Sequence, residues 1–199
     1  FIFANISSEQ TDGITSPEYL EKVDEFAKWL EEQDEIATVT TIADVIKTLN
    51  QNMNGGFEEY YSIPDDKSLN AQYFLLYEFS VPYGMDLKNQ MTADKAESRM
   101  LIRMNMITSR ESILFNDKVN LWLNENLDSF KSRGVVGIPI MMPYVYRENT
   151  DGLLRGLIFS FSLIVIVIGL SLRSLKFGLI SIVPNIVPFV VSYGILAMI

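Results

Sequence analysis

The sequence predicts an α+β domain followed by an all-α hairpin of two membrane-spanning helices. Before residue 150 the chain twice repeats a strand, helix, strand pattern, and two long apolar runs follow. All 25 acidic residues and 13 of the 16 basic residues lie at or before Asp151, and the remainder holds three basic residues and no acidic one. The two parts are therefore suited to different solvents, with a boundary near residue 150.

The first strand, helix, strand unit begins at the start of the chain. Residues 1–6 are rich in β-formers, and Ser16 before Pro17 is a helix N-cap followed by a first-turn proline. Residues 36–42, IATVTTI, are β-branched and predict a second strand. Between them, apolar side chains recur at helical spacing, namely Tyr19, Leu20, Val23, Phe26, Ala27 and Leu30.

The second unit follows after residue 96. A half-buried strand is predicted here, because Met100, Ile102, Met104 and Met106 alternate with Arg99, Leu101, Arg103 and Asn105. A capping box over residues 108–111 then opens a helix with one apolar face, and residues 134–138, GVVGI, predict a short strand. Two such units predict a ferredoxin-like split βαβ domain, with an antiparallel sheet and both helices on one face.

Residues 43–96 form an insert between the two units. Residues 43–53 and 69–79 are predicted to be helical, with a turn at residues 54–56. The insert is rich in aromatic residues, which pack in a core more often than they bind a ligand. The alternative is an apolar lining for a lipid-like substrate. The candidate lining residues are Tyr60, Tyr61, Tyr73, Phe74 and Tyr77.

Residues 152–172 and 177–199 are each long and apolar enough to cross a bilayer as a helix. Residues 173–176 form a short turn that carries Arg173 and Lys176. By the positive-inside rule this turn is cytoplasmic, which predicts that residues 1–150 are periplasmic. Pro184 and Pro188 interrupt the second span and predict a hinge or a kink that neighbouring helices shelter.

The composition excludes several functions. The chain has no Cys and no His, so it offers no thiolate or imidazole nucleophile and no nitrogen- or sulfur-ligated zinc. We find no candidate catalytic, cofactor-binding or metal-binding residues and expect that the protein is not an enzyme. The acidic domain lacks the clustered Lys and Arg that nucleic acid requires. We interpret its negative charge as a solvated surface, with a site for cationic partners as the alternative.

The hairpin sequence SLRSLKFGLISIVPNIVPFVVSYGILAM resembles the region of the second and third spans of the resistance-nodulation-division (RND) superfamily. Upstream, SPEYLEKVDEFAKWLEEQDEIATVTTIADVIKTLNQNMNGG, YYSIPDD and QYFLLYEFS are similar to the first porter domain of its lipid-exporting branch. That branch includes the hopanoid and mycobacterial membrane-lipid (MMPL-like) exporters. The resemblance covers essentially the whole chain.

This resemblance implies part of a proton-driven inner-membrane exporter of lipids or other hydrophobic molecules, whose porter domain passes substrate away from the outer leaflet. The implied partners are membrane lipids or a hydrophobic substrate and the remaining transmembrane helices of a full-length chain. Assembly into a homo-oligomer is left open. The proton-relay aspartate of the family lies in the fourth span, beyond residue 199, so no motor residue is transferred to this sequence.

Two other functions fit the same architecture. The chain could be a membrane-tethered extracytoplasmic sensor or adaptor, whose helices only anchor it or signal. It could also be an accessory domain of another permease or of a protein-export complex. A sensor usually continues from its last membrane helix into a cytoplasmic heptad-patterned helix. Here only residues 173–176 separate the two apolar runs, which favours the exporter.

Overall fold

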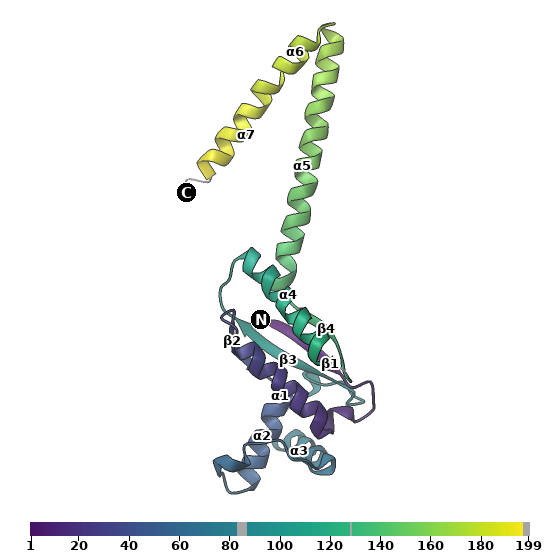
Figure 1. Ribbon diagram of the computed structural model, residues 1–199, viewed down its shortest axis with the longest axis vertical. Helices are drawn as coiled ribbons and strands as arrows, with labels where there is room; N and C mark the ends of the chain where they lie inside the picture. Colours follow the sequence, from purple (N-terminus) through teal and green to yellow (C-terminus); the bar gives the residue numbers. More distant parts are fainter. Residues whose placement is uncertain (83–86, 128, 197–199) are drawn as a thin grey trace. The chain divides into compact units, whose positions relative to one another are not determined.

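The computed structural model describes residues 1–82, 87–127 and 129–196 and divides the chain into two compact units, residues 1–144 and 145–199 (Figure 1). The first unit is an α+β domain with one antiparallel sheet. The second unit is helical. The boundary at Tyr144 lies a few residues before the composition boundary near residue 150.

The sheet has four strands in the order β2-β3-β1-β4, and every neighbouring pair is antiparallel. The strands are β1 (Ile2–Ser7), β2 (Ile36–Thr40), β3 (Glu97–Met104) and β4 (Lys131–Val136). Alternate residues of the central strands point into the core, so Ile2, Ala4 and Ile6 of β1 and Met100 and Ile102 of β3 are fully buried. Their neighbours on the other face are half-buried or exposed, as the alternation in the sequence predicted for β3.

Helices α1 (Pro17–Glu31) and α4 (Ser109–Asn126) cover the same face of the sheet (Figure 1). The rings of Phe26 and Trp29 of α1 stack with Trp122 of α4, with ring centroids 4.8 and 5.6 Å from Trp122. Both predicted N-termini are confirmed. The Ser16 side chain accepts a hydrogen bond from the Tyr19 amide, and Thr108 and Glu111 form a reciprocal capping box.

The insert contains α2 (Ile42–Met53) and α3 (Lys67–Ser80), which lie together near one end of α1 (Figure 1). Short 3₁₀ turns occur at η1 (Gly13–Thr15), η2 (Glu58–Tyr60) and η3 (Leu87–Asn89). Ile42, Ala43 and Ile46 of α2 and Phe74 of α3 belong to the same apolar core as the sheet. The insert is therefore packed into the domain.

The second unit is built from three helices. Helix α5 (Ile138–Ser171) starts in the first unit and contributes most of its length to the second, and α6 (Leu175–Ile180) and α7 (Ile182–Leu196) follow. Among the described residues α5 is the one helix that is long and apolar enough to cross a membrane, by length and composition alone. A shorter apolar stretch covers Lys176–Ser192.

Several predicted boundaries are wrong. The second strand ends at Thr40, because Thr41 forms a capping box with Asp44 and starts α2. Met106 lies beyond β3 and is fully exposed. The last strand begins earlier than predicted, at Lys131, and ends at Val136, because Ile138 already begins α5. The second apolar run, residues 177–199, in which the sequence predicted an interruption at Pro184 and Pro188, divides at Ser181 into α6 and α7. Residues 197–199 of that run lie outside the described residues.

The division at Ser181 follows from Pro184. A proline at position 184 has no amide proton to donate to the carbonyl of Ile180, four residues earlier, and Ile180 is the last residue of α6. Pro184 itself falls in the first turn of α7, where a missing amide costs little. Pro188 lies inside α7, so the carbonyl of Pro184 has no helical donor.

Candidate functional site

The five aromatic candidates of the insert fall into two groups. Tyr73 and Phe74 are buried in the core, and Tyr77 is half-buried against it. Tyr60 and Tyr61 lie at the surface, with 39% and 45% of their area exposed. Among the five candidates these two are the most accessible to a ligand, whereas Tyr73 and Phe74 could reach one only after a rearrangement of the core.

Asn50 holds this surface in place. Its side-chain amide donates hydrogen bonds to the carbonyls of Tyr60 and Ser62, at 3.0 and 3.1 Å. Its side-chain oxygen accepts one from the hydroxyl of Tyr73, at 3.2 Å, and one from the amide of Asn54. One buried asparagine of α2 therefore fixes the loop that carries the two exposed tyrosines and joins it to α3.

The surface of this loop is apolar and acidic. Phe57 and Met53 are more than half exposed beside Tyr60 and Tyr61. Residues 51–66 contain four carboxylates, namely Glu58, Glu59, Asp65 and Asp66, and no basic residue. A ligand of this surface would need apolar parts, and an anionic headgroup would be repelled.

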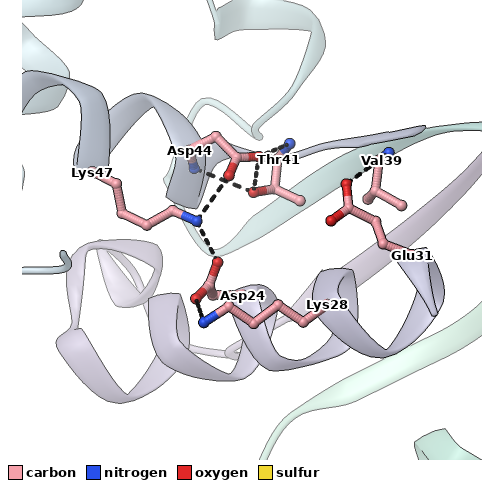
Figure 2. Close-up of polar contacts among 7 residues, drawn as sticks. All are labelled: Asp24, Lys28, Glu31, Val39, Thr41, Asp44 and Lys47. Atoms are coloured by element: carbon pink, nitrogen blue, oxygen red, sulfur yellow. Dashed lines mark hydrogen bonds and ion pairs between the residues drawn. The ribbon is translucent and has the colours of Figure 1, made fainter. Parts of the chain in front are cut away.

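A cluster of ion pairs fastens the insert to the sheet domain (Figure 2). Asp24 of α1 pairs with Lys47 of α2 at 2.5 Å and with Lys28 of its own helix at 2.9 Å. Lys47 also pairs with Asp44 at 2.9 Å, and its ammonium lies 5.1 Å from the centre of the Tyr61 ring. Asp24 and Lys47 are each only 8% exposed, so the contact between α1 and α2 contains a nearly dry charge pair.

Asp24 and Lys47 both remain charged near neutral pH. Burial alone would raise the pKa of Asp24, but hydrogen bonds from Lys47 and Lys28 outweigh it and hold that pKa below its ordinary value. Burial alone would lower the pKa of Lys47, but hydrogen bonds to Asp24 and Asp44 outweigh it and raise the pKa. The cluster thus keeps its charges through the physiological range and is unsuited to relay protons.

Sequence reasoning missed this cluster. A signal was present, because Asp24 interrupts the apolar stripe of α1 between Leu20, Val23 and Ala27. A carboxylate in that position requires a cation, yet the partner Lys47 lies 23 residues away on another helix. Neither residue alone would have identified the other.

A polar hollow of about 450 Å³ lies beside β4, lined in part by Asn5, Glu97 and Lys131. Lys131 pairs with Glu9 at 2.6 Å, and the Asn5 amide donates to Glu97 at 2.8 Å. These groups are therefore engaged with one another. Over the described residues, no group of three or more His, Cys, Asp or Glu side chains could hold a metal ion.

The remaining candidates lie in the second unit. Arg173 and Lys176 are exposed and flank the junction of α5 and α6. Pro184 and Pro188 lie in α7, as described above. The two basic residues therefore lie at the turn where α5 ends and α6 begins.

Comparisons with protein-family models, with curated proteins and with solved structures find no match to this chain.

Proposed function

We propose that this chain is part of a proton-driven exporter of lipids or other hydrophobic molecules, of the RND superfamily, in which residues 1–150 form a ferredoxin-like porter domain. The observation that carries the proposal is a sheet with the strand order β2-β3-β1-β4, whose last strand along the chain, β4, is followed directly by the long apolar helix α5. This order interleaves two strand, helix, strand units, β1-α1-β2 and β3-α4-β4, as the split βαβ arrangement requires.

The second support is the helical unit. Helix α5 has the length and composition of a membrane span, and the apolar stretch at Lys176–Ser192 returns after a basic turn. With Arg173 and Lys176 on the cytoplasmic side, the acidic domain lies in the periplasm and the chain in the inner membrane. The remaining transmembrane helices of a full-length chain would shelter the proline-containing helix α7.

In this proposal the insert contacts the substrate. Tyr60 and Tyr61 present exposed rings on a loop that Asn50 holds in place, and the Tyr73 hydroxyl donates to Asn50 from the core. Phe74 and Tyr77 pack in or against the core. Exposed apolar side chains on a fixed scaffold lower the entropic cost of binding a flexible lipid. The acidic rim of the loop favours lipids without an anionic headgroup. No covalent chemistry is required, and the protein acts as a carrier and not as an enzyme.

The test is lipid export by cells that contain or lack the protein. We expect cells without it to retain a lipid class that the wild-type gene returns to the outer surface, and a protonophore to block this return. Tyr60→Ser with Tyr61→Ser should reduce export. Phe79→Ser, which removes a ring that is 81% exposed on α3, is the matched control and should not. An unchanged distribution of every lipid class after deletion contradicts the exporter and favours the tethered sensor or adaptor.

A further inference from the structure

The turn between α5 and α6 is closed by a Schellman motif with an unusual residue. The Ser174 amide donates to the Gly169 carbonyl at 3.0 Å, and the Arg173 amide donates to the Leu170 carbonyl at 3.2 Å. The position after the helix cap, which must adopt a left-handed conformation, is Arg173, with φ of 49°. Glycine normally occupies this position because a side chain there is strained. The backbone alone therefore does not explain an arginine.

A hollow opens beside this arginine. It has a volume of about 330 Å³ and is lined by Ile166, Gly169, Leu170, Arg173 and Ser174. Its lining therefore combines two aliphatic side chains with a guanidinium and a hydroxyl. The side chain that strains the turn is the charged group of this hollow.

A second hollow, of about 510 Å³, lies between α5 and the helices that follow it. Its lining is almost entirely apolar, and it shares Ile166 with the first hollow. The lining residues are Ile158, Phe161, Ser162, Val165, Ile166, Leu179 and Ile182. Because the two hollows share Ile166, they lie next to each other along α5, and we refer to them together as the groove, which has Arg173 at one end.

Close packing of α5 against α6 keeps this groove in shape. A β-carbon at Gly178 would lie 2.7 Å from the Val165 carbonyl oxygen and 3.2 Å from the Cα of Gly169. Such distances leave no room for a side chain at this point. The groove therefore has a fixed wall next to its charged end.

The positive charges near the groove indicate the kind of molecule that binds in it. Residues 152–199 contain Arg155, Arg173 and Lys176 and no acidic residue. Within the described part of the chain, neither Arg173 nor Lys176 takes part in an ion pair with a carboxylate. Basic pockets between membrane helices on the cytoplasmic side bind anionic lipid headgroups. An aliphatic groove of this size complements an acyl chain.

We propose that the turn between α5 and α6 is a binding site for an anionic phospholipid of the cytoplasmic leaflet. The phosphate lies at Arg173 and Lys176, and one acyl chain lies in the groove that passes Ile166. This inference rests on the proposed membrane insertion of α5 and does not require transport. It assigns a bound lipid that differs from an exported substrate in both site and leaflet.

The test is native mass spectrometry of the detergent-purified chain with equimolar phosphatidylglycerol and phosphatidylcholine. We expect the chain to retain phosphatidylglycerol in preference. Arg173→Gln should weaken its binding about fivefold, and the double variant with Lys176→Gln more strongly. Arg155→Gln removes one positive charge from α5 at a position that lines neither hollow, and it should leave binding unchanged.

A second pair of variants tests the groove. Ile166→Trp fills the residue common to both hollows and should displace the lipid, whereas Leu163→Trp adds the same bulk on α5 outside the groove and should not. Equal retention of both lipids, or equal losses in the two tryptophan variants, would overturn the proposal. Displacement of phosphatidylglycerol by inorganic phosphate would reveal a simple anion site and would also overturn it.

Two further results separate this inference from other outcomes. Lipid-independent self-association of the chain that Ile166→Trp abolishes would show that a second helix occupies the groove, and would overturn the lipid site. Resistance of the chain to carbonate extraction tests membrane insertion separately. Failure of insertion, failure of lipid binding and failure of export therefore give three distinguishable results.

Discussion

Replacement of Lys47 by Met isolates the buried charge pair that fastens the insert to α1. Methionine keeps an unbranched apolar stem like that of lysine but removes the ammonium that lies 2.5 Å from Asp24. Asp24 is 8% exposed and would retain only Lys28 as a partner, whose side chain is 71% exposed. Removing one partner of a buried pair costs about 3–5 kcal/mol when the other charge is left alone. Because Lys28 remains, we expect a loss of about 2–3 kcal/mol.

Tryptophan fluorescence measures this loss without interference from the membrane helices. The chain has two tryptophans, Trp29 and Trp122, whose rings stack on each other and pack, half-buried, against the core of the sheet domain. In urea titrations of the detergent-purified chain, a loss of this size shifts the unfolding midpoint by about 1 M. Lys28→Met is the control, since its exposed pair should contribute at most about 1 kcal/mol. Equal shifts for the two variants would refute the assignment of the pair as a buried fastening.

The pH dependence of the same variant follows from the sign of the pKa shift. Because the pKa of Asp24 is lowered in the folded protein, its contribution to stability is complete above its ordinary value of 3.8. It is lost as pH falls through the lowered pKa. We therefore expect the difference between wild type and Lys47→Met to be constant from pH 5 to 9 and to shrink below pH 3.8. A difference that changes near pH 7 would contradict this.

Three further predictions concern other contacts. Gly178→Ala should lower the thermal stability of the helical unit, because its β-carbon meets the Val165 carbonyl, whereas Gly156→Ala, which meets nothing within 4 Å, should not. Tyr19→Phe should cost about 1–3 kcal/mol, because the buried hydroxyl donates to the Ile6 carbonyl at 2.6 Å. Burial raises the pKa of Tyr19 to about 12, so this variant should also lack part of the stability loss between pH 10 and 12. Asn50→Ala should make limited proteolysis near Tyr60 and Tyr61 faster, and an unchanged cleavage rate would show that the loop is held by other contacts.

Local signals predicted the parts of the fold that depend on neighbouring residues. The N-caps at Ser16 and Thr108 and the alternation of β3 follow from interactions within a few residues, and the structure confirms them. Strand ends were less predictable, because Thr41 has β propensity but forms a capping box instead. Whether Thr41 ends a strand or caps a helix depends on its hydrogen bonds with Asp44, and the β propensity of a single residue does not include such an interaction.

The candidate site was harder to predict. Aromatic composition identified the insert but did not separate exposed Tyr60 and Tyr61 from buried Tyr73 and Phe74, because that division depends on how α2 and α3 pack. The pair of Asp24 and Lys47 is a tertiary contact between two helices. The left-handed Arg173 could not be predicted either, since glycine is the residue that such a turn favours.

The topology of the chain is the most direct test of the account. The sequence contains no cysteine, so single cysteines can be introduced without first replacing a native cysteine. Ser62→Cys lies on the exposed loop of the insert, and Ser174→Cys lies in the turn after α5. In intact cells a membrane-impermeant maleimide should label Ser62→Cys, and it should label Ser174→Cys only after permeabilisation. Labelling in the opposite order, or of both sites in intact cells, would contradict a periplasmic domain carried on a membrane hairpin.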